Sequence, residues 1–139
     1  MAIVRHELNI AAINEQIHGR TGGVARDMLR RGLRVQTAAK RLCKVDTGRL
    51  RGSISVAMEP RDSFGIATFG IIVGTNVDYA TYVINGTGVY GPHASPIVPK
   101  TKSWLVFTNR ATGKLVFAKQ VKGQKGVNFL RNALPAARS

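Results

Sequence analysis

The sequence predicts an α+β fold in which a long amino-terminal helix and a carboxy-terminal helix pack on a four-stranded, mainly antiparallel sheet. Apolar residues recur at helical spacing between residues 22 and 44, and again between residues 127 and 134. Between these two regions, stretches typical of strands come in two pairs, each joined by a turn. A chain of 139 residues fits one domain, so we expect a single domain over residues 1–139.

Two helices are expected in the first third of the chain. Isoleucines three and four residues apart predict a short amphipathic helix over residues 8–18 that ends at Gly19. The sequence Gly-Arg-Thr-Gly-Gly then interrupts the helical pattern. We expect Thr21 to cap the second helix, over residues 22–44, because a threonine hydroxyl can accept a hydrogen bond from a free backbone amide at a helix start.

The second helix has an apolar side and a basic side. One stripe of this helix is apolar and is expected to face the core: Val24, Met28, Val35, Ala39 and Leu42. The opposite stripe is basic: Arg26, Arg30, Arg34, Arg41 and Lys44. Gly32 lowers helix stability by about 1 kcal/mol relative to alanine, so we expect close packing against another element there. Cys43, the single cysteine, is predicted to be a small buried group near the helix end.

A hairpin is expected after this helix. Residues 46–48 suit a turn, and residues 53–58 alternate polar and apolar side chains with the period of a half-buried strand. Residues 59–63 are predicted to form a turn, because they include a proline and an aspartate. Residues 64–74 then supply the second strand, and the short connection makes antiparallel pairing the simplest arrangement.

The second half of the chain combines short elements with a long loop. Residues 78–84 offer one or two helical turns, and the glycines and prolines of residues 86–102 predict a long loop. Residues 103–107 and 114–121 are expected to form a second hairpin, followed by a helix over residues 127–134. The loop carries four apolar residues that we expect to contact a neighbouring protein: Val89, Tyr90, Ile97 and Val98.

The composition indicates a globular protein with an anionic partner. Hydrophobic residues make up 44% of the chain, and no apolar run is long enough to span a membrane. Charges interrupt the first ten residues, so we expect no secretory signal and a protein assembled in a cytoplasm. Lysine and arginine total 21 against 7 acidic residues, a formal charge of +14. Such a charge favours nucleic acid or an acidic protein surface as partner, with a merely solvated basic face as the alternative.

No pattern in the sequence predicts catalysis, a cofactor or a metal site. The three histidines lie on different predicted elements, without acidic or cysteine neighbours at metal-ligand spacing. No two carboxylates are placed for general acid and base work. Lys100 follows Pro99 where a phosphate-binding loop needs a glycine, so that kind of loop is rejected. No aromatic residue lies between Gly19 and Phe64, and base stacking by the basic helix is therefore not expected.

Three segments stand out in order along the chain. They are residues 45–54, which join the basic helix to the first strand, residues 73–88 with an asparagine turn and two tyrosines, and residues 128–134. Together they resemble the gene-product-ten-like head–tail connector family of long-tailed bacteriophages. The residues that carry the resemblance suit turns and packing. They are Asp46, Thr47, Gly48, Leu50, Gly74, Thr75, Asn76, Tyr79, Val83, Gly86, Thr87, Gly88, Phe129 and Leu130.

The resemblance implies a non-enzymatic virion protein of the phage neck, with residues 1–139 as one neck domain. It implies a homo-oligomeric ring of about six copies, with about twelve as the alternative, because cyclic symmetry lets identical subunits surround a passage. Adjacent head-closure and tail-terminator proteins are the expected partners, and the genome passes through the ring without sequence-specific binding. Two other functions stay open: a tail terminator or head-closure protein of the same neck, and a basic nucleic-acid-binding protein.

Overall fold

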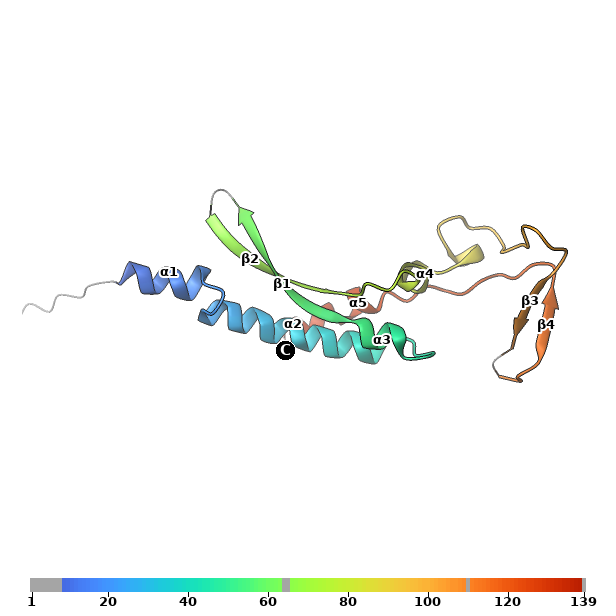
Figure 1. The fold of residues 1–139 in the computed structure, drawn as a ribbon, viewed down its shortest axis with the longest axis horizontal. Helices are drawn as coiled ribbons and strands as arrows, with labels where there is room; N and C mark the ends of the chain where they lie inside the picture. The colour runs from blue at the N-terminus through green and yellow to red at the C-terminus, as the bar shows by residue number, and fades with distance from the viewer. Residues whose placement is uncertain (1–8, 64–65, 110, 139) are drawn as a thin grey trace, which may run out of the picture. The chain divides into compact units, whose positions relative to one another are not determined.

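The computed structural model of the protein describes residues 9–63, 66–109 and 111–138. These residues form two compact units. The first unit holds the described residues up to Thr75 together with those from Leu130 onward, and the second unit is Asn76–Phe129. The α+β class is confirmed, with helices and antiparallel strands in the order that Figure 1 shows. One domain over residues 1–139 stays a prediction.

The described strands form two separate sheets, which corrects the predicted four-stranded sheet. β1 (Ser55–Ser63) pairs with β2 (Ile66–Gly74), and β3 (Leu105–Thr108) pairs with β4 (Leu115–Ala118), both antiparallel. Each sheet is thus a hairpin between strands that are neighbours in sequence. Alternation and turns predict the pairing inside a hairpin, but they do not determine whether two hairpins share an edge.

The first helix, α1 (Ile10–His18), ends where the sequence predicts. Its start is capped by Asn9, whose Oδ1 accepts a hydrogen bond from the Ala12 amide at 3.0 Å. Gly19 follows its last turn, as expected. The helix packs beside the start of the next helix, but none of its residues is buried. Residue 8, the predicted first residue, lies outside the described residues.

The second helix, α2 (Gly23–Leu42), is not capped by Thr21, which corrects that prediction. The Thr21 hydroxyl donates instead to Glu15 Oε1 at 3.2 Å. The Gly23 amide donates to Gln16 Oε1 at 2.9 Å, so a side chain of the preceding helix satisfies the first free amide of α2.

The buried side of α2 differs in part from the predicted apolar stripe. Val35 and Ala39 are buried as expected, but Val24 and Leu42 are 43% and 46% exposed. The buried side is centred on small residues instead: Ala25, Gly32, Val35 and Ala39. The buried stripe is therefore rotated slightly around the helix axis relative to the predicted stripe. The small side chains allow a neighbouring element to approach closely.

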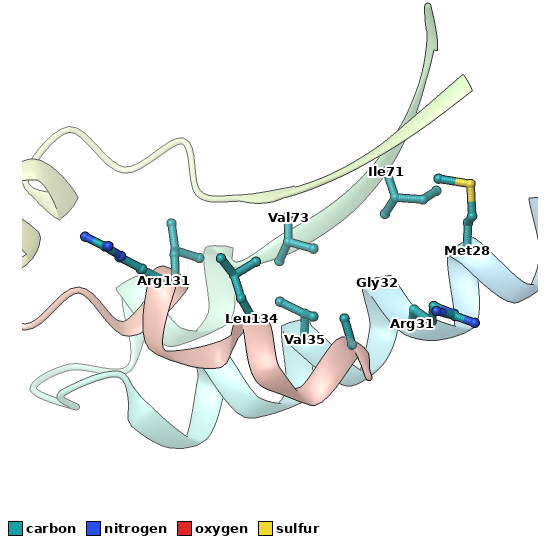
Figure 2. Close-up of a pocket in the computed structure, with 10 residues that line it drawn as sticks. Met28, Arg31, Gly32, Val35, Ile71, Val73, Arg131 and Leu134 are labelled. Carbon is teal, nitrogen blue, oxygen red and sulfur yellow. The ribbon is translucent and has the colours of Figure 1, made fainter. Parts of the chain in front are cut away.

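The β1–β2 hairpin crosses α2 at Gly32. A Cβ atom built on Gly32 would lie 2.5 Å from Ile71 Cγ2 and 3.2 Å from Val56 Cγ1. This contact supplies the close packing that the sequence predicts at Gly32, and Figure 2 shows Ile71 and Gly32 at this crossing. The hairpin lies along one side of α2 in Figure 1.

The bounds of this hairpin correct two predictions. Residues 59–63, predicted as a turn, continue β1, whose register runs from Ser55 opposite Gly74 to Ser63 opposite Ile66. A proline is tolerated there because each strand of a two-stranded sheet is an edge strand. Residues 53 and 54 precede the strand, and residues 64 and 65 of the predicted second strand lie outside the described residues.

A short helix, α3 (Arg49–Ser53), stands where no helix is predicted. Leu50 and the following Ile54 are both buried, and Cys43 is 4% exposed, which confirms that the cysteine is a buried group at the end of α2. Gln36 Nε2 donates to the Ile54 carbonyl at 2.7 Å and so ties α2 to the segment that enters β1.

The predicted carboxy-terminal helix is present as two short helices. α5 (Phe129–Ala133) is followed by a 3-10 helix, η2 (Leu134–Ala137), which contains Pro135 and packs on α2. The proline lies near the helix end, as expected, because its ring cannot continue the α-helical hydrogen bonds.

The second unit consists of short elements and loops. α4 (Ala80–Asn85) confirms the predicted helical turns, and the long loop contains a 3-10 helix, η1 (Gly88–Tyr90). The second hairpin is confirmed as β3 and β4. At its turn the Gly113 amide donates to the Asn109 carbonyl at 2.7 Å, and Gly113 has the positive φ that such turns require.

Candidate protein-contact surfaces

Four arginines form the basic side of α2, which we name the arginine face: Arg26, Arg30, Arg34 and Arg41. All four are exposed, and they lie on the side of the helix opposite Val35 and Ala39, as the sequence predicts. The one carboxylate within α2 belongs to Asp27, and it pairs with Arg31 at 2.7 Å. α2 itself therefore supplies no second carboxylate to the arginine face.

A depression of about 600 Å³ lies on the arginine face. It combines three guanidinium groups with apolar and small residues, and it is lined by Arg30, Leu33, Arg34, Thr37, Ala38, Arg41, Leu42 and Ala136. Leu42, predicted as core, thus belongs to this surface. Arginine offers several donors in a planar group that matches carboxylate and phosphate oxygens. An anionic partner that also presents an apolar side chain fits this combination.

Arg26 stands apart from the depression at the amino-terminal end of the arginine face. Its Nε donates to the Thr21 carbonyl at 3.1 Å, so its side chain is turned back toward the connection between α1 and α2. The structure therefore brings together Arg30, Arg34 and Arg41, and it does not bring Arg26 into the same cluster.

A second cavity in the first unit is apolar. It has a volume of about 360 Å³ and lies between α2, β2 and the two carboxy-terminal helices. Val35, Val73 and Leu134 point toward one another in Figure 2, whereas Arg131 points away from them. Leu130, one of the residues that carry the resemblance, also lines it. An apolar lining without a convergent polar group favours packing over chemistry at this cavity.

The residues that carry the resemblance to connector proteins are called the resemblance residues below. In the first unit they form two groups, one in the turn before α3 and one after β2. Gly48 has φ of 81°, the left-handed geometry expected of the predicted turn, and Leu50 beside it is buried. The Arg49 amide donates to Thr47 Oγ1 at 3.5 Å. The Thr75 hydroxyl lies 2.6 Å from the Ser53 hydroxyl, which joins the chain after Gly74 to the end of α3. Asp46 is exposed in the same turn.

The remaining resemblance residues belong to the second unit and the start of α5. Asn76 is exposed, Tyr79 is 39% exposed at the start of α4, and Phe129 is fully buried. The Val83 carbonyl accepts a hydrogen bond from the Val127 amide at 2.9 Å. These positions thus act mainly in packing and backbone pairing, and they do not gather into one exposed cluster.

A crossing of two glycine-rich segments organises the second unit. The Thr87 amide donates to the Gln124 carbonyl at 2.9 Å, and the Gln124 amide donates to Thr87 Oγ1 at 3.1 Å. A Cβ atom on Gly86 would lie 2.7 Å from the Gly126 nitrogen, and one on Gly88 would overlap the Lys122 carbonyl. Gly86 and Gly88 both have positive φ. Only glycine fits such an approach between backbones.

Sequence reasoning missed the second segment of this crossing. The sequence predicts residues 122–126 only as a loop before the last helix, yet they supply the backbone groups that residues 86–89 require. The one signal in the sequence is that Lys-Gly-Gln-Lys-Gly at residues 122–126 contains two glycines, as does Gly-Thr-Gly at residues 86–88. Spacing alone does not identify which glycine segments meet.

The four apolar loop residues are exposed, as a contact role requires. Val89, Tyr90, Ile97 and Val98 are between 38% and 56% exposed. Ile97 lines a cavity of about 490 Å³ with the resemblance residues Gly86, Thr87 and Gly88, whereas the other three loop residues do not line it. The Lys125 ammonium lies 5.6 Å from the centre of the Tyr90 ring, within cation–π range.

The part of the chain that the structure describes contains neither a cluster of metal-ligand side chains nor a membrane-spanning helix. No three histidine, cysteine, aspartate or glutamate side chains there come together as a metal site would need. No helix there combines the length and apolar character of a membrane span. Comparison of the chain with models of protein families, with curated proteins and with solved structures finds no match.

Proposed function

We propose that the protein is a structural subunit of the neck of a long-tailed bacteriophage, where identical copies form a ring between the head-completion proteins and the tail. The supporting observation is the balance of exposed and buried apolar side chains. Among the residues whose burial the structure describes (9–59, 69–109 and 111–138), nine apolar side chains are buried, whereas twenty-one large apolar residues are exposed. Most isolated soluble proteins cover more of their large apolar residues, and extensive exposed patches mark interaction surfaces.

The resemblance of three segments to phage head–tail connector proteins favours a closed ring as the kind of assembly that these exposed surfaces form. Resemblance residues such as Gly48, Leu50 and Phe129 occupy turn or core positions, so they support a shared fold more directly than a shared contact. A single small subunit cannot enclose a passage, and a closed ring of about six copies would do so. The ring works by forming interfaces, with no chemical step.

The arginine face supplies the polar part of these interfaces. Arg30, Arg34 and Arg41 around an apolar depression suit an acidic protein surface that carries apolar side chains. Adjacent head-closure and tail-terminator proteins would present that surface. Tight binding to the genome would oppose DNA ejection, so the same arginines are expected to face proteins and not the passage.

Charge reversal on the arginine face tests this function. Arg30→Glu combined with Arg34→Glu should prevent the protein from restoring infectivity when it is mixed with heads and tails that lack it. The matched control reverses Arg20 and Arg49, which are exposed and lie outside the arginine face, so the net charge changes equally. The free energy of unfolding of both variants, measured by thermal denaturation, should stay within about 0.5 kcal/mol of the wild-type value, since substitutions on the surface rarely change stability by more than this.

The nucleic-acid-binding alternative predicts a different pattern. The wild type would then retain duplex DNA with an affinity that falls steeply as salt rises, because bound phosphates release counterions. The charge-reversed protein would lose this retention and still join heads to tails. That combination of results would show that the arginine face binds DNA and not adjacent neck proteins. A wild type that retains DNA and fails to restore infectivity to heads and tails that lack it would replace the neck function by DNA binding.

A further inference from the structure

The two strands of the second hairpin carry the same apolar run. β3 contains Leu-Val-Phe at residues 105–107, and β4 contains Leu-Val-Phe at residues 115–117. Strands that are polar on one face alternate, whereas continuous apolar runs are typical of strands that are buried on both faces. The sequence of this hairpin is therefore that of a strand pair inside a larger sheet.

In the structure both faces of the hairpin are exposed. Val106 and Phe117 lie opposite each other on one face and are 54% and 63% exposed. Phe107, on the other face, lies opposite Val116 and is 43% exposed. Phe107 would normally be buried against a second layer, since an aromatic ring gains most of its stabilising free energy from burial.

The hairpin also has no third strand among the described residues. Beyond the β3–β4 pairing, the only sheet contact near it is the single bridge between Ile97 and Val121. An isolated two-stranded sheet is marginally stable in water, and its outer edges leave backbone donors and acceptors available for another strand. The hairpin therefore lacks both a pairing strand and a covering layer.

The charge of the surrounding chain indicates what kind of molecule can supply them. From Tyr79 to the end of the chain there is no aspartate or glutamate. Exposed lysines flank the two strands: Lys102, Lys114, Lys119 and Lys122. A second copy of the hairpin would bring like charges together, whereas a segment with carboxylates would pair with them.

We propose that the β3–β4 hairpin is the docking element for an extended, acidic segment of a different protein. The segment adds as a strand to a free edge of the hairpin, alternate apolar side chains cover the exposed face around Phe117, and its carboxylates meet the flanking lysines. This inference rests on the proposed neck function, in which the segment belongs to an adjacent neck protein. The backbone donors and acceptors at the outer edges of the hairpin favour a protein strand over single-stranded nucleic acid. Phe107 and Phe117 are exposed rings on which bases could stack, so binding of a single-stranded oligonucleotide in place of the glutamate peptide would overturn the inference.

Trp104, the single tryptophan, makes the docking measurable. It precedes β3, is 48% exposed, and the Lys119 ammonium lies 5.4 Å from the centre of its ring. A strand that adds to the hairpin will exclude water from this ring and draw Lys119 toward a carboxylate. The tryptophan emission should then shift to shorter wavelength.

The test titrates the full chain with a short peptide in which glutamate alternates with valine, and with a matched peptide in which lysine replaces glutamate. The glutamate peptide should shift the Trp104 emission with an affinity that falls as salt rises, and the lysine peptide should not. Phe117→Thr keeps a strand-forming residue and should weaken binding about tenfold or more. Ile72→Thr changes an exposed apolar strand residue of the other hairpin and should leave binding unchanged.

Three results of the peptide titration would overturn the inference: no shift with the glutamate peptide, equal shifts with both peptides, or binding that Phe117→Thr does not weaken. A Trp104 shift that depends on protein concentration without peptide would show that a second copy covers the hairpin instead. The peptide measurement is independent of the neck function. Peptide binding by a wild-type protein that fails to restore infectivity to heads and tails that lack it would refute the neck function alone.

Discussion

Replacing Gly32 by alanine should destabilise the first unit, although the same change in an open helix position stabilises. Two opposing effects act at this position. Alanine favours the helix by about 1 kcal/mol relative to glycine. Against this, the new Cβ would lie 2.5 Å from Ile71 Cγ2 and 3.2 Å from Val56 Cγ1, closer than side chains tolerate. Overpacking of this kind costs about 1 to 3 kcal/mol, so we expect a net loss of about 1 kcal/mol in the free energy of unfolding.

A double-mutant cycle isolates the contact with Ile71. Ile71→Ala removes the Cγ2 methyl that the new side chain would meet, at its own cost in burial. In that background Gly32→Ala should become neutral or stabilising, because the helix preference is no longer opposed. Urea unfolding followed by circular dichroism of all four proteins measures the coupling. Equal effects of Gly32→Ala in both backgrounds would show that the crossing does not require glycine.

Gly52 provides the matched control for this cycle. It lies in α3 and is exposed, and a Cβ atom added there would have no other atom within 4 Å. Gly52→Ala should therefore stabilise the protein by about 0.4 to 1 kcal/mol through the unfolded chain and the helix preference. A stabilising Gly32→Ala of the same size would refute the close approach of the hairpin to α2.

Three further substitutions probe other contacts. Gly88→Ala should lower the stability of the second unit by about 2 kcal/mol or more, because Gly88 has φ of 63° and its Cβ would overlap the Lys122 carbonyl; loss of amide protection at residues 86–89 would report it. Gln36→Ala should cost about 1 kcal/mol in urea unfolding, since the Ile54 carbonyl loses its 2.7 Å hydrogen bond. Burial raises the pKa of Cys43 above its ordinary value, with a smaller opposing effect of Arg51, so the thiol contributes stability that is present below about pH 8.5 and lost as pH rises further. As the pH rises from about 8 to about 10, the free energy of unfolding of the wild type should therefore fall relative to that of Cys43→Ala. A difference between the two proteins that does not change with pH would contradict the raised pKa.

The sequence predicts the first unit well where a single periodicity dominates. The arginine face, the end of α1 at Gly19 and the buried Cys43 follow from helical spacing and capping rules that depend on near neighbours. Thr21 fails as a cap because Gln16, seven residues before Gly23, reaches the same amide from another helix. Local preference identifies a residue able to cap, but the relative placement of two helices decides which residue does so.

The second unit is less predictable because backbone pairing replaces side-chain patterns. Gly86 and Gly88 meet residues 122–126 through main-chain hydrogen bonds, which leave no periodicity in the sequence. The hairpin of β3 and β4 is predicted because its turn and its apolar strands are local signals. Whether that hairpin joins the other pair of strands depends on packing across a long intervening loop, and the sequence contains no local signal for it.

The charge of the chain leads to opposite salt effects on the two kinds of contact. Copies that each carry a formal charge of +14 repel one another, so a ring of identical subunits must be held by apolar surfaces and opposed by charge. Raising the ionic strength from about 0.01 M to about 0.15 M shortens the screening length from about 30 Å to about 8 Å and should favour self-association, measured as mass by light scattering. Contacts of the arginine face with acidic partners should weaken over the same range. If self-association also weakens as salt rises, ion pairs between copies hold the ring, and the arginine face belongs to the subunit interface instead of the partner interface.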